Sequence, residues 1–185
     1  MKHKAFFLIL IPVIFLSSCQ EEGGKAPVSS GNETIKTSTY QTELDSLYGN
    51  YRWQYDKLPE EMSGKTILQA ILYTKETFSL SSPYSGEQRA YLKIRTHPRY
   101  GKDILFGVRS GILMQKYVSA RFDDRPMRKF DTIDAENGDH TALFIANYNE
   151  FLKELKKSKS LRLEVKFYEE PTQILRFNVE GLKWP

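Results

Sequence analysis

Apolar and polar residues alternate in short runs along most of the chain after residue 50, a pattern typical of half-buried β-strands. The first run, residues 50–58, places Tyr51, Trp53 and Tyr55 on one face. Six further runs, rich in β-branched and aromatic residues, lie at 66–78, 89–96, 102–108, 116–122, 161–169 and 173–179. The last two flank Pro171 and predict a β-hairpin.

A helical period interrupts the strands at residues 147–158. Apolar residues recur there at positions i, i+3, i+4 and i+7, and they predict an amphipathic helix: Tyr148, Phe151, Leu152 and Leu155. Asn147 and Glu150 have the spacing of a capping box at its start. A similar spacing at residues 38–49 predicts one short N-terminal helix.

Together these elements predict a single mainly β domain over residues 39–185. We expect a β-sandwich or jelly-roll-like fold with one late amphipathic helix. A parallel α/β sheet would need several crossover helices, which the pattern does not provide. Residues 19–38 contain almost no apolar side chains, so they cannot offset the entropy of ordering, and we expect a flexible tether there.

The first residues have the layout of a secretory signal peptide. Lys2 and Lys4 precede an apolar run at residues 5–16, which is too short to span a membrane as a helix of roughly 20 residues. The sequence Leu-Ser-Ser-Cys, ending at Cys19, resembles the lipobox of bacterial lipoproteins. The resemblance implies cleavage after residue 18 and a lipidated Cys19. An ordinary signal peptide followed by an unmodified cysteine is the alternative.

A lipidated Cys19 would place the protein in the bacterial cell envelope. Several acyl chains give firm membrane anchoring, and we expect the outer membrane, with the periplasmic or surface face left open. Cys19 is the only cysteine in the chain, so the fold must hold without disulfides.

Positive charge gathers in one part of the chain. Residues 89–129 carry eleven basic and three acidic side chains, although the whole chain has a net charge of only +4. Such asymmetry favours an anionic partner: a phospholipid, lipopolysaccharide, teichoic acid or an acidic protein surface. The alternative is a solvated face balanced by acidic segments elsewhere. Nucleic acid is not an expected partner of a lipid-anchored exported protein.

Charged side chains gather where the strand at 116–122 ends. Arg121 and Asp123 are two positions apart, so we expect them to share a face as an ion pair. A second interpretation makes this end of the strand a recognition corner for an envelope partner. The candidate contact residues are Arg121, Asp123, Arg125 and Arg128.

Two stretches approach known ligand motifs without meeting them. The sequence Gly-Lys-Thr at residues 64–66 lacks the earlier glycine of a phosphate-binding loop, because position 59 is Pro59. The acidic run 131–139 lacks the alternating ligands of an EF-hand, and Asn137-Gly138 within it favours a hairpin turn instead.

Catalytic arrangements are equally hard to find. His97 and His140 are far apart and have no cysteine near them, which argues against a metal site. Asp123 and Asp124 are adjacent, so on a strand they would point to opposite faces and could not serve one substrate. We predict no catalytic residues, no metal and no cofactor, and we favour a protein that is not an enzyme.

Several short motifs follow the order of the VasI-like domain associated with type VI secretion loci, which the chain resembles from Met62 to Trp184. They are YLKIR at 91–95, SARFDDRP at 119–126, ALF at 142–144, FLKELKKSKSLRLEVKFY at 151–168 and LRFNVEGL at 175–182. The resemblance implies a small exported β-rich domain without assigned catalysis. We therefore predict a lipid-anchored binding or accessory module for another envelope component. The alternatives are a structural subunit of a secretion or transport assembly, or an envelope hydrolase of an unfamiliar type.

Overall fold

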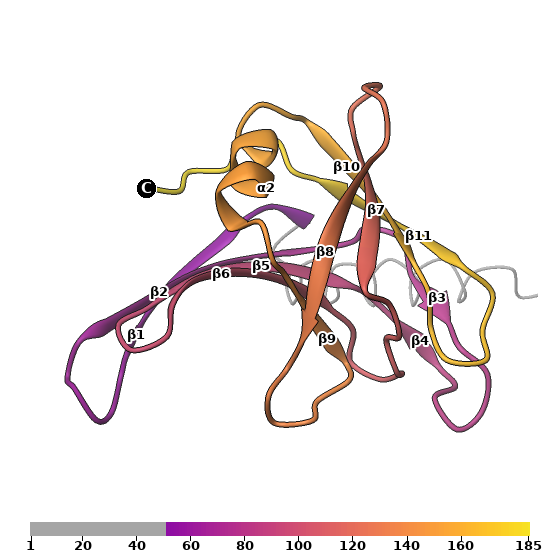
Figure 1. The fold of residues 1–185 in the computed structure, drawn as a ribbon, viewed down its shortest axis with the longest axis horizontal. Coiled ribbons are helices and arrows are strands. Elements are labelled where there is room, and N and C mark those ends of the chain that lie inside the picture. The colour runs from indigo at the N-terminus through magenta and orange to yellow at the C-terminus, as the bar shows by residue number, and fades with distance from the viewer. Residues whose placement is uncertain (1–50) are drawn as a thin grey trace, which may run out of the picture.

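A computed structural model of the protein describes residues 51–185, and Figure 1 shows its fold. The predicted signal peptide, tether and N-terminal helix lie outside this range. The strands are β1 (Gln54–Pro59), β2 (Thr66–Tyr73), β3 (Phe78–Ser79), β4 (Glu87–Gln88), β5 (Tyr91–His97), β6 (Gly101–Gly107), β7 (Tyr117–Phe122), β8 (Arg128–Asp134), β9 (Ala142–Ile145), β10 (Ser160–Val165) and β11 (Gln173–Asn178). The helix within this range is α2 (Tyr148–Leu155).

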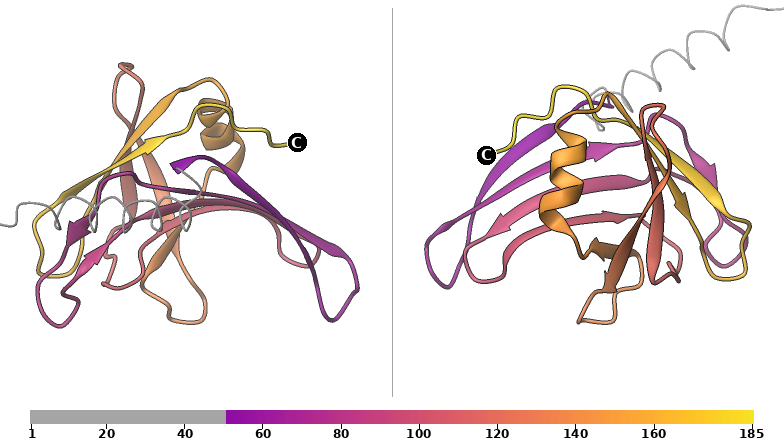
Figure 2. Two further views of the ribbon diagram at one scale, coloured as in Figure 1. Left: turned by 180° about the vertical axis from the view of Figure 1, so that it is seen from behind. Right: turned by 45° about the horizontal axis from the view of Figure 1, so that its top comes forward.

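Nine strands form one antiparallel sheet in the order β1-β2-β5-β6-β9-β8-β7-β10-β11, while β3 and β4 pair separately. The sheet folds over along β9 and β8, so that β1, β2, β5 and β6 form a first layer and β7, β10 and β11 a second (Figures 1 and 2). Helix α2 lies in the angle between these layers (Figure 2). The predicted mainly β, sandwich-like domain with a late amphipathic helix is thus confirmed.

The core lies between the two layers because alternate residues of each strand face inward. In the first layer, Leu92 of β5 pairs with Phe106 of β6, and both are fully buried. In the second layer, Leu163 of β10 pairs with Leu175 of β11, and both are again buried. Their sequence neighbours point outward, and the outer faces carry the candidate sites described below.

Three phenylalanines, the aromatic cluster, join α2 to the hairpin of β7 and β8. The ring centroid of Phe151 lies 4.9 Å from that of Phe130 and 5.3 Å from that of Phe122. All three pairs meet edge to face, the geometry that aromatic quadrupoles prefer. Phe151, Leu152 and Leu155 form the buried face of α2, as the helical period predicts.

Two local predictions differ from the structure. Asn147 precedes α2 but makes no side-chain cap hydrogen bond, and the Glu150 carboxylate pairs with Arg128. Strands β8 and β9 have no counterpart among the predicted strands, because β8 has Phe130 as its one buried side chain and β9 is only four residues long. The turn predicted at residues 137–138 is confirmed, since β8 and β9 pair on either side of it.

The segment after β11, residues 179–185, runs from the edge of the second layer to the first layer and to α2. We call it the C-terminal strap. The Trp53 indole N–H donates to the Val179 carbonyl at 3.1 Å, and the Lys183 N–H donates to the Tyr55 hydroxyl at 2.7 Å. The Trp184 indole N–H donates to a hydroxyl of α2 at 3.1 Å. Trp53 and Tyr55 therefore share a face, as predicted, and that face holds the strap.

Candidate functional site

The structure places the four predicted contact residues in different surroundings. Arg125 donates to the Glu154 carboxylate and the Ser158 hydroxyl, and Arg128 pairs with Glu150 and, at 3.6 Å, with Glu154. These two arginines therefore fasten the β7–β8 hairpin to α2 over the aromatic cluster. Both side chains remain about two-fifths exposed and line a pocket of about 290 Å³ with Phe122, Pro126 and Glu154, so their role as partner contacts stays a prediction.

Asp123 also holds the fold together. Its φ of 51° is in the left-handed region, which aspartate adopts more readily than most residues. Its Oδ1 accepts hydrogen bonds from the backbone N–H groups of Lys159 and Ser160, both at 2.9 Å. Asp123 thus connects the end of β7 to the start of β10. The ion pair predicted between Arg121 and Asp123 does not form, and Arg121 lies 3.9 Å from Asp124 instead.

The hydrogen bonds of the Asp123 carboxylate predict that the free energy of unfolding falls at acid pH. The hydrogen bond from Ser160, with that from Lys159, holds the pKa of Asp123 below its usual value. A carboxyl group with a lowered folded-state pKa contributes stability above its unfolded-state pKa of about 3.9, and loses it as the pH falls through the folded-state pKa. In Asp123→Asn, which keeps an oxygen acceptor, we expect the free energy of unfolding to fall less steeply below about pH 4.

Urea unfolding at a series of pH values measures that slope. Asp134→Asn is the matched control, because Asp134 is exposed and makes no ion pair within residues 51–185. Its slope should equal that of the wild type. Equal slopes for Asp123→Asn and the wild type would contradict the assignment.

Arg121 belongs to a row of arginines across the outer face of the second layer. The register pairs Arg121 of β7 with Arg162 of β10, and Arg162 with Arg176 of β11. Neighbouring strands are about 4.8 Å apart, so the three side chains leave the sheet next to one another. We call these three residues the arginine row.

The arginine row is poorly neutralised. Asp124, whose side chain is 92% exposed, lies 3.9 Å from Arg121 and 3.8 Å from Arg162. Arg176 makes no ion pair within residues 51–185, and its guanidinium donates to the carbonyl of Ile174 at 3.4 Å. Like charges directly opposite one another destabilise a sheet. An anion bound across the row would relieve this repulsion.

Sequence reasoning found only Arg121 of the three. The predicted hairpin of residues 161–169 and 173–179 carried a usable signal, because Arg162 and Arg176 alternate with its apolar residues and must face outward. Arg121 joins them only through the pairing of β7 with β10, two segments distant in sequence.

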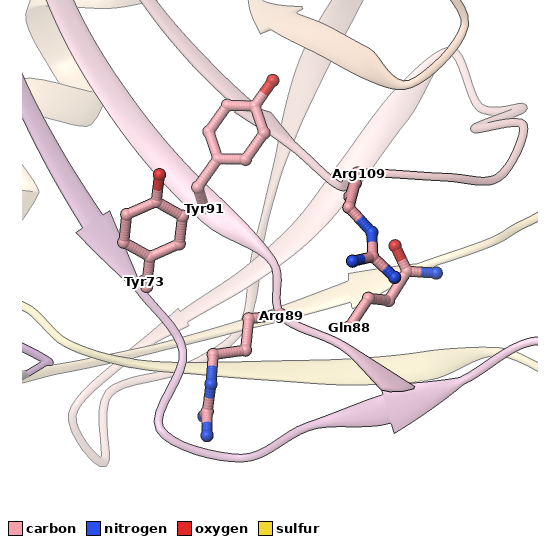
Figure 3. A pocket seen from close by; sticks show the side chains of 5 residues that line it. All are labelled: Tyr73, Gln88, Arg89, Tyr91 and Arg109. Carbon is pink, nitrogen blue, oxygen red and sulfur yellow. The ribbon is translucent and has the colours of Figure 1, made fainter. Parts of the chain in front are cut away.

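A second candidate site is a pocket of about 310 Å³ on the outer face of the first layer. We call it the tyrosine pocket, and its lining residues are Tyr73, Gln88, Arg89, Tyr91 and Arg109. Figure 3 shows the two tyrosine rings on one side of it and the ends of Arg109 and Gln88 on the other, while Arg89 turns away. No motif in the sequence pointed to these residues, since they come from three separate segments.

The tyrosine rings form a fixed wall of the pocket. The ring centroids of Tyr73 and Tyr91 are 6.3 Å apart, and the rings meet edge to face. Tyr91 lies opposite Gly107, where a Cβ atom would come within 2.6 Å of the Tyr91 hydroxyl and 2.9 Å of the Thr141 carbonyl oxygen. Burial, and then the Asp139 carboxylate, raise the pKa of Tyr91, so its hydroxyl remains a hydrogen-bond donor at neutral pH.

Donor groups occupy the opposite side of the pocket. The Arg109 guanidinium donates to the Glu87 carbonyl at 3.3 Å and makes no ion pair within residues 51–185. Gln88 accepts a hydrogen bond from Ser110 N–H at 3.0 Å, but its buried Nε2 has no hydrogen-bond partner. A donor left unpaired in this way costs about 1–3 kcal/mol. The pocket therefore combines aromatic walls with donors suited to an anionic or hydroxylated ligand.

Other kinds of site are not found in the described part of the chain. Residues 51–185 contain no group of three or more histidine, cysteine or acidic side chains that could hold a metal ion. They also contain no helix that is long and apolar enough to cross a membrane. Comparison of the chain with protein families, curated proteins and solved structures gives no match.

Proposed function

We propose that this protein is a lipid-anchored binding module that holds an anionic component of the bacterial envelope on its arginine row. The row is the observation that carries the proposal. Three guanidinium groups stand on adjacent strands, and within residues 51–185 one exposed carboxylate, that of Asp124, lies within ion-pair distance of the row.

Arginine is suited to this task. Its planar guanidinium stays charged at every physiological pH and binds phosphate or carboxylate groups through two parallel hydrogen bonds. A row of such groups on one sheet face would bind a polyanion at several points along its length. The rigid backbone pairing of β7, β10 and β11 fixes the spacing before any partner arrives, which lowers the entropy lost on binding.

The anchor and the compartment complete the proposal. Lipidation of Cys19, implied by the lipobox resemblance, would hold the domain at the outer membrane, where anionic lipids and glycans are concentrated. The resemblance to the VasI-like domain is consistent with an accessory role beside a larger envelope assembly. Both the lipid anchor and this resemblance fit a binding protein without catalytic activity.

Reversing the charge of the row should abolish capture of the partner. Full-length lipidated protein is purified from the gently solubilised envelope of its own cells, and the bound protein, lipid and glycan are identified. We expect Arg121→Glu with Arg162→Glu and Arg176→Glu to lower recovery of the partner by about tenfold or more, since each lost charged hydrogen bond is worth about 1.5–3 kcal/mol. Raised salt should release the wild-type partner, because exposed charges are screened.

The matched control makes the same change of charge elsewhere. Lys65, Lys102 and Lys153 are exposed and make no ion pair within residues 51–185, so their replacement by glutamate should leave capture intact. A Cys19→Ala variant should lose its lipid and leave the membrane fraction. A partner that remains bound to the charge-reversed row, or no captured component with the wild type, would reject the proposal.

A further inference from the structure

The tyrosine pocket does not stand alone, because a groove adjoins it. The groove has a volume of about 360 Å³ and shares Tyr73 with the pocket. Its lining residues include Tyr51, Tyr73, Lys75, Lys159, Arg176 and Asn178. The groove therefore leads from the tyrosine pocket in the first layer to Arg176, at the end of the arginine row in the second.

We propose that the anionic component is an acidic glycan, and that its chain lies along the pocket and the groove from Arg109 to Arg176. This inference rests on the proposed function and names the class of its ligand. We call the combined surface the glycan track. A chain that leaves the groove at Arg176 would continue across the remaining two arginines of the row.

The walls of the track match the chemistry of an acidic sugar. A sugar ring presents flat C–H faces that pack on aromatic rings, and the pocket offers the paired rings of Tyr73 and Tyr91. Its volume is near the lower end for small-molecule sites, which suits a single ring rather than a large ligand. The protonated Tyr91 hydroxyl can donate to a sugar oxygen.

Two exposed arginines lie at the two ends of the track. Arg109 and Arg176 are exposed, and neither makes an ion pair within residues 51–185. If two separated sugar units each carried a carboxylate, each guanidinium group could form two parallel hydrogen bonds with one of them. Glu76 is the one acidic residue that lines the groove. Lys159 pairs with Glu180 at 3.5 Å, so Lys75 and Arg176 leave the groove with a small positive charge.

Other anionic ligands fit the track less well. A phospholipid would offer its charged headgroup to the guanidinium groups, but its acyl chains stay in the bilayer and would leave the tyrosine rings unused. Free phosphate would use the guanidinium groups but not the tyrosines. A ligand that alternates flat C–H faces with carboxylates uses both features along the whole track.

The test titrates full-length lipidated protein, held in detergent, with oligogalacturonates of increasing length. Neutral galactose oligomers of the same lengths and vesicles of anionic phospholipid are the comparison ligands. We expect the affinity for oligogalacturonate to rise with its length until the oligomer spans both the tyrosine pocket and the groove. Neutral oligomers should bind with an affinity at least about tenfold lower, because they lack the carboxylates that pair with the arginines.

Variants separate the track from the rest of the surface. Arg109→Gln, at an exposed side chain, should weaken binding of the longer oligomers by about tenfold. Arg109→Lys should recover part of the lost affinity, because lysine keeps the positive charge but cannot form the two parallel hydrogen bonds of a guanidinium group. Arg99→Gln removes an exposed arginine outside the track and is the control. Tyr73→Phe should bind normally, since it keeps the ring, and Tyr73→Ala should not.

Two results would overturn the inference. The first is a wild-type protein that does not bind oligogalacturonate, or that binds it with the same affinity as the Arg109→Gln variant. Either outcome would show that the track does not hold an acidic glycan. Vesicle binding that depends on the arginine row, without glycan binding, would also overturn it while leaving the proposed function in place. Circular dichroism of each variant excludes unfolding, and Arg109→Gln decides the matter if Tyr73→Ala fails to fold.

Discussion

Replacing Phe151 by alanine should lower the free energy of unfolding by about 3–5 kcal/mol. Phe151 is fully buried at the contact of α2 with the sheet, and its ring touches both other members of the aromatic cluster. Its loss would leave a cavity that Phe122 and Phe130 cannot fill, because each is held in a strand. Urea denaturation of the purified protein measures the change.

Met127→Ala is the control for that experiment. Met127 lies between β7 and β8, near the cluster in sequence, but 55% of it is exposed. Its removal should change the free energy of unfolding by no more than about 0.5 kcal/mol. A change of less than about 1 kcal/mol in Phe151→Ala would show that α2 contributes little to the core.

Trp53→Ala should have a loss of similar size, about 3–5 kcal/mol. Trp53 is 8% exposed and lies immediately before β1, where its indole N–H donates to the Val179 carbonyl of the C-terminal strap. The substitution removes the buried ring and the hydrogen bond together. Circular dichroism should follow the unfolding, because in this variant tryptophan fluorescence would report on Trp184 alone.

Trp53→Phe separates the two contributions. It keeps most of the ring but removes the donor, so we expect a smaller loss of about 1–2 kcal/mol. Tyr100→Phe is a control at an exposed aromatic residue and should be neutral. Equal stability of Trp53→Ala and the wild type would show that the strap does not join the two layers.

The fold was largely predictable because alternation records which side of a strand is buried. The inward residues of β5, β10 and β11 follow the alternation seen in the sequence. Strands β6 and β7 instead bury runs of three or four successive residues. Strand β8 escaped prediction because it forms part of the bend and buries little besides Phe130. The prediction that Glu150 caps the helix was wrong because of a contact that is distant in sequence. Arg128 approaches from another element and competes for the carboxylate, which no local pattern contains.

The candidate sites were less predictable than the fold. The ion pairs of Arg125 and Arg128 with α2 could not be predicted, because charge in a sequence does not reveal its partners. The arginine row and the glycan track depend on strand register, which brings distant residues to one surface. Counting charges over residues 89–129 located the basic segment, but Arg162 and Arg176 lie outside it.

The C-terminal strap also bears on how the chain reaches this structure. Trp53 and Val179 are 126 positions apart, and Tyr55 and Lys183 are 128 apart. Contacts this distant in sequence form late, because the entropy of closing the loop must be offset first, and such β-rich topologies fold in about milliseconds to seconds. A growing chain adds only about 5–20 residues per second, so Trp53 and Tyr55 wait several seconds for their partners in the strap. During that time the edge of β1 has its aromatic side chains exposed.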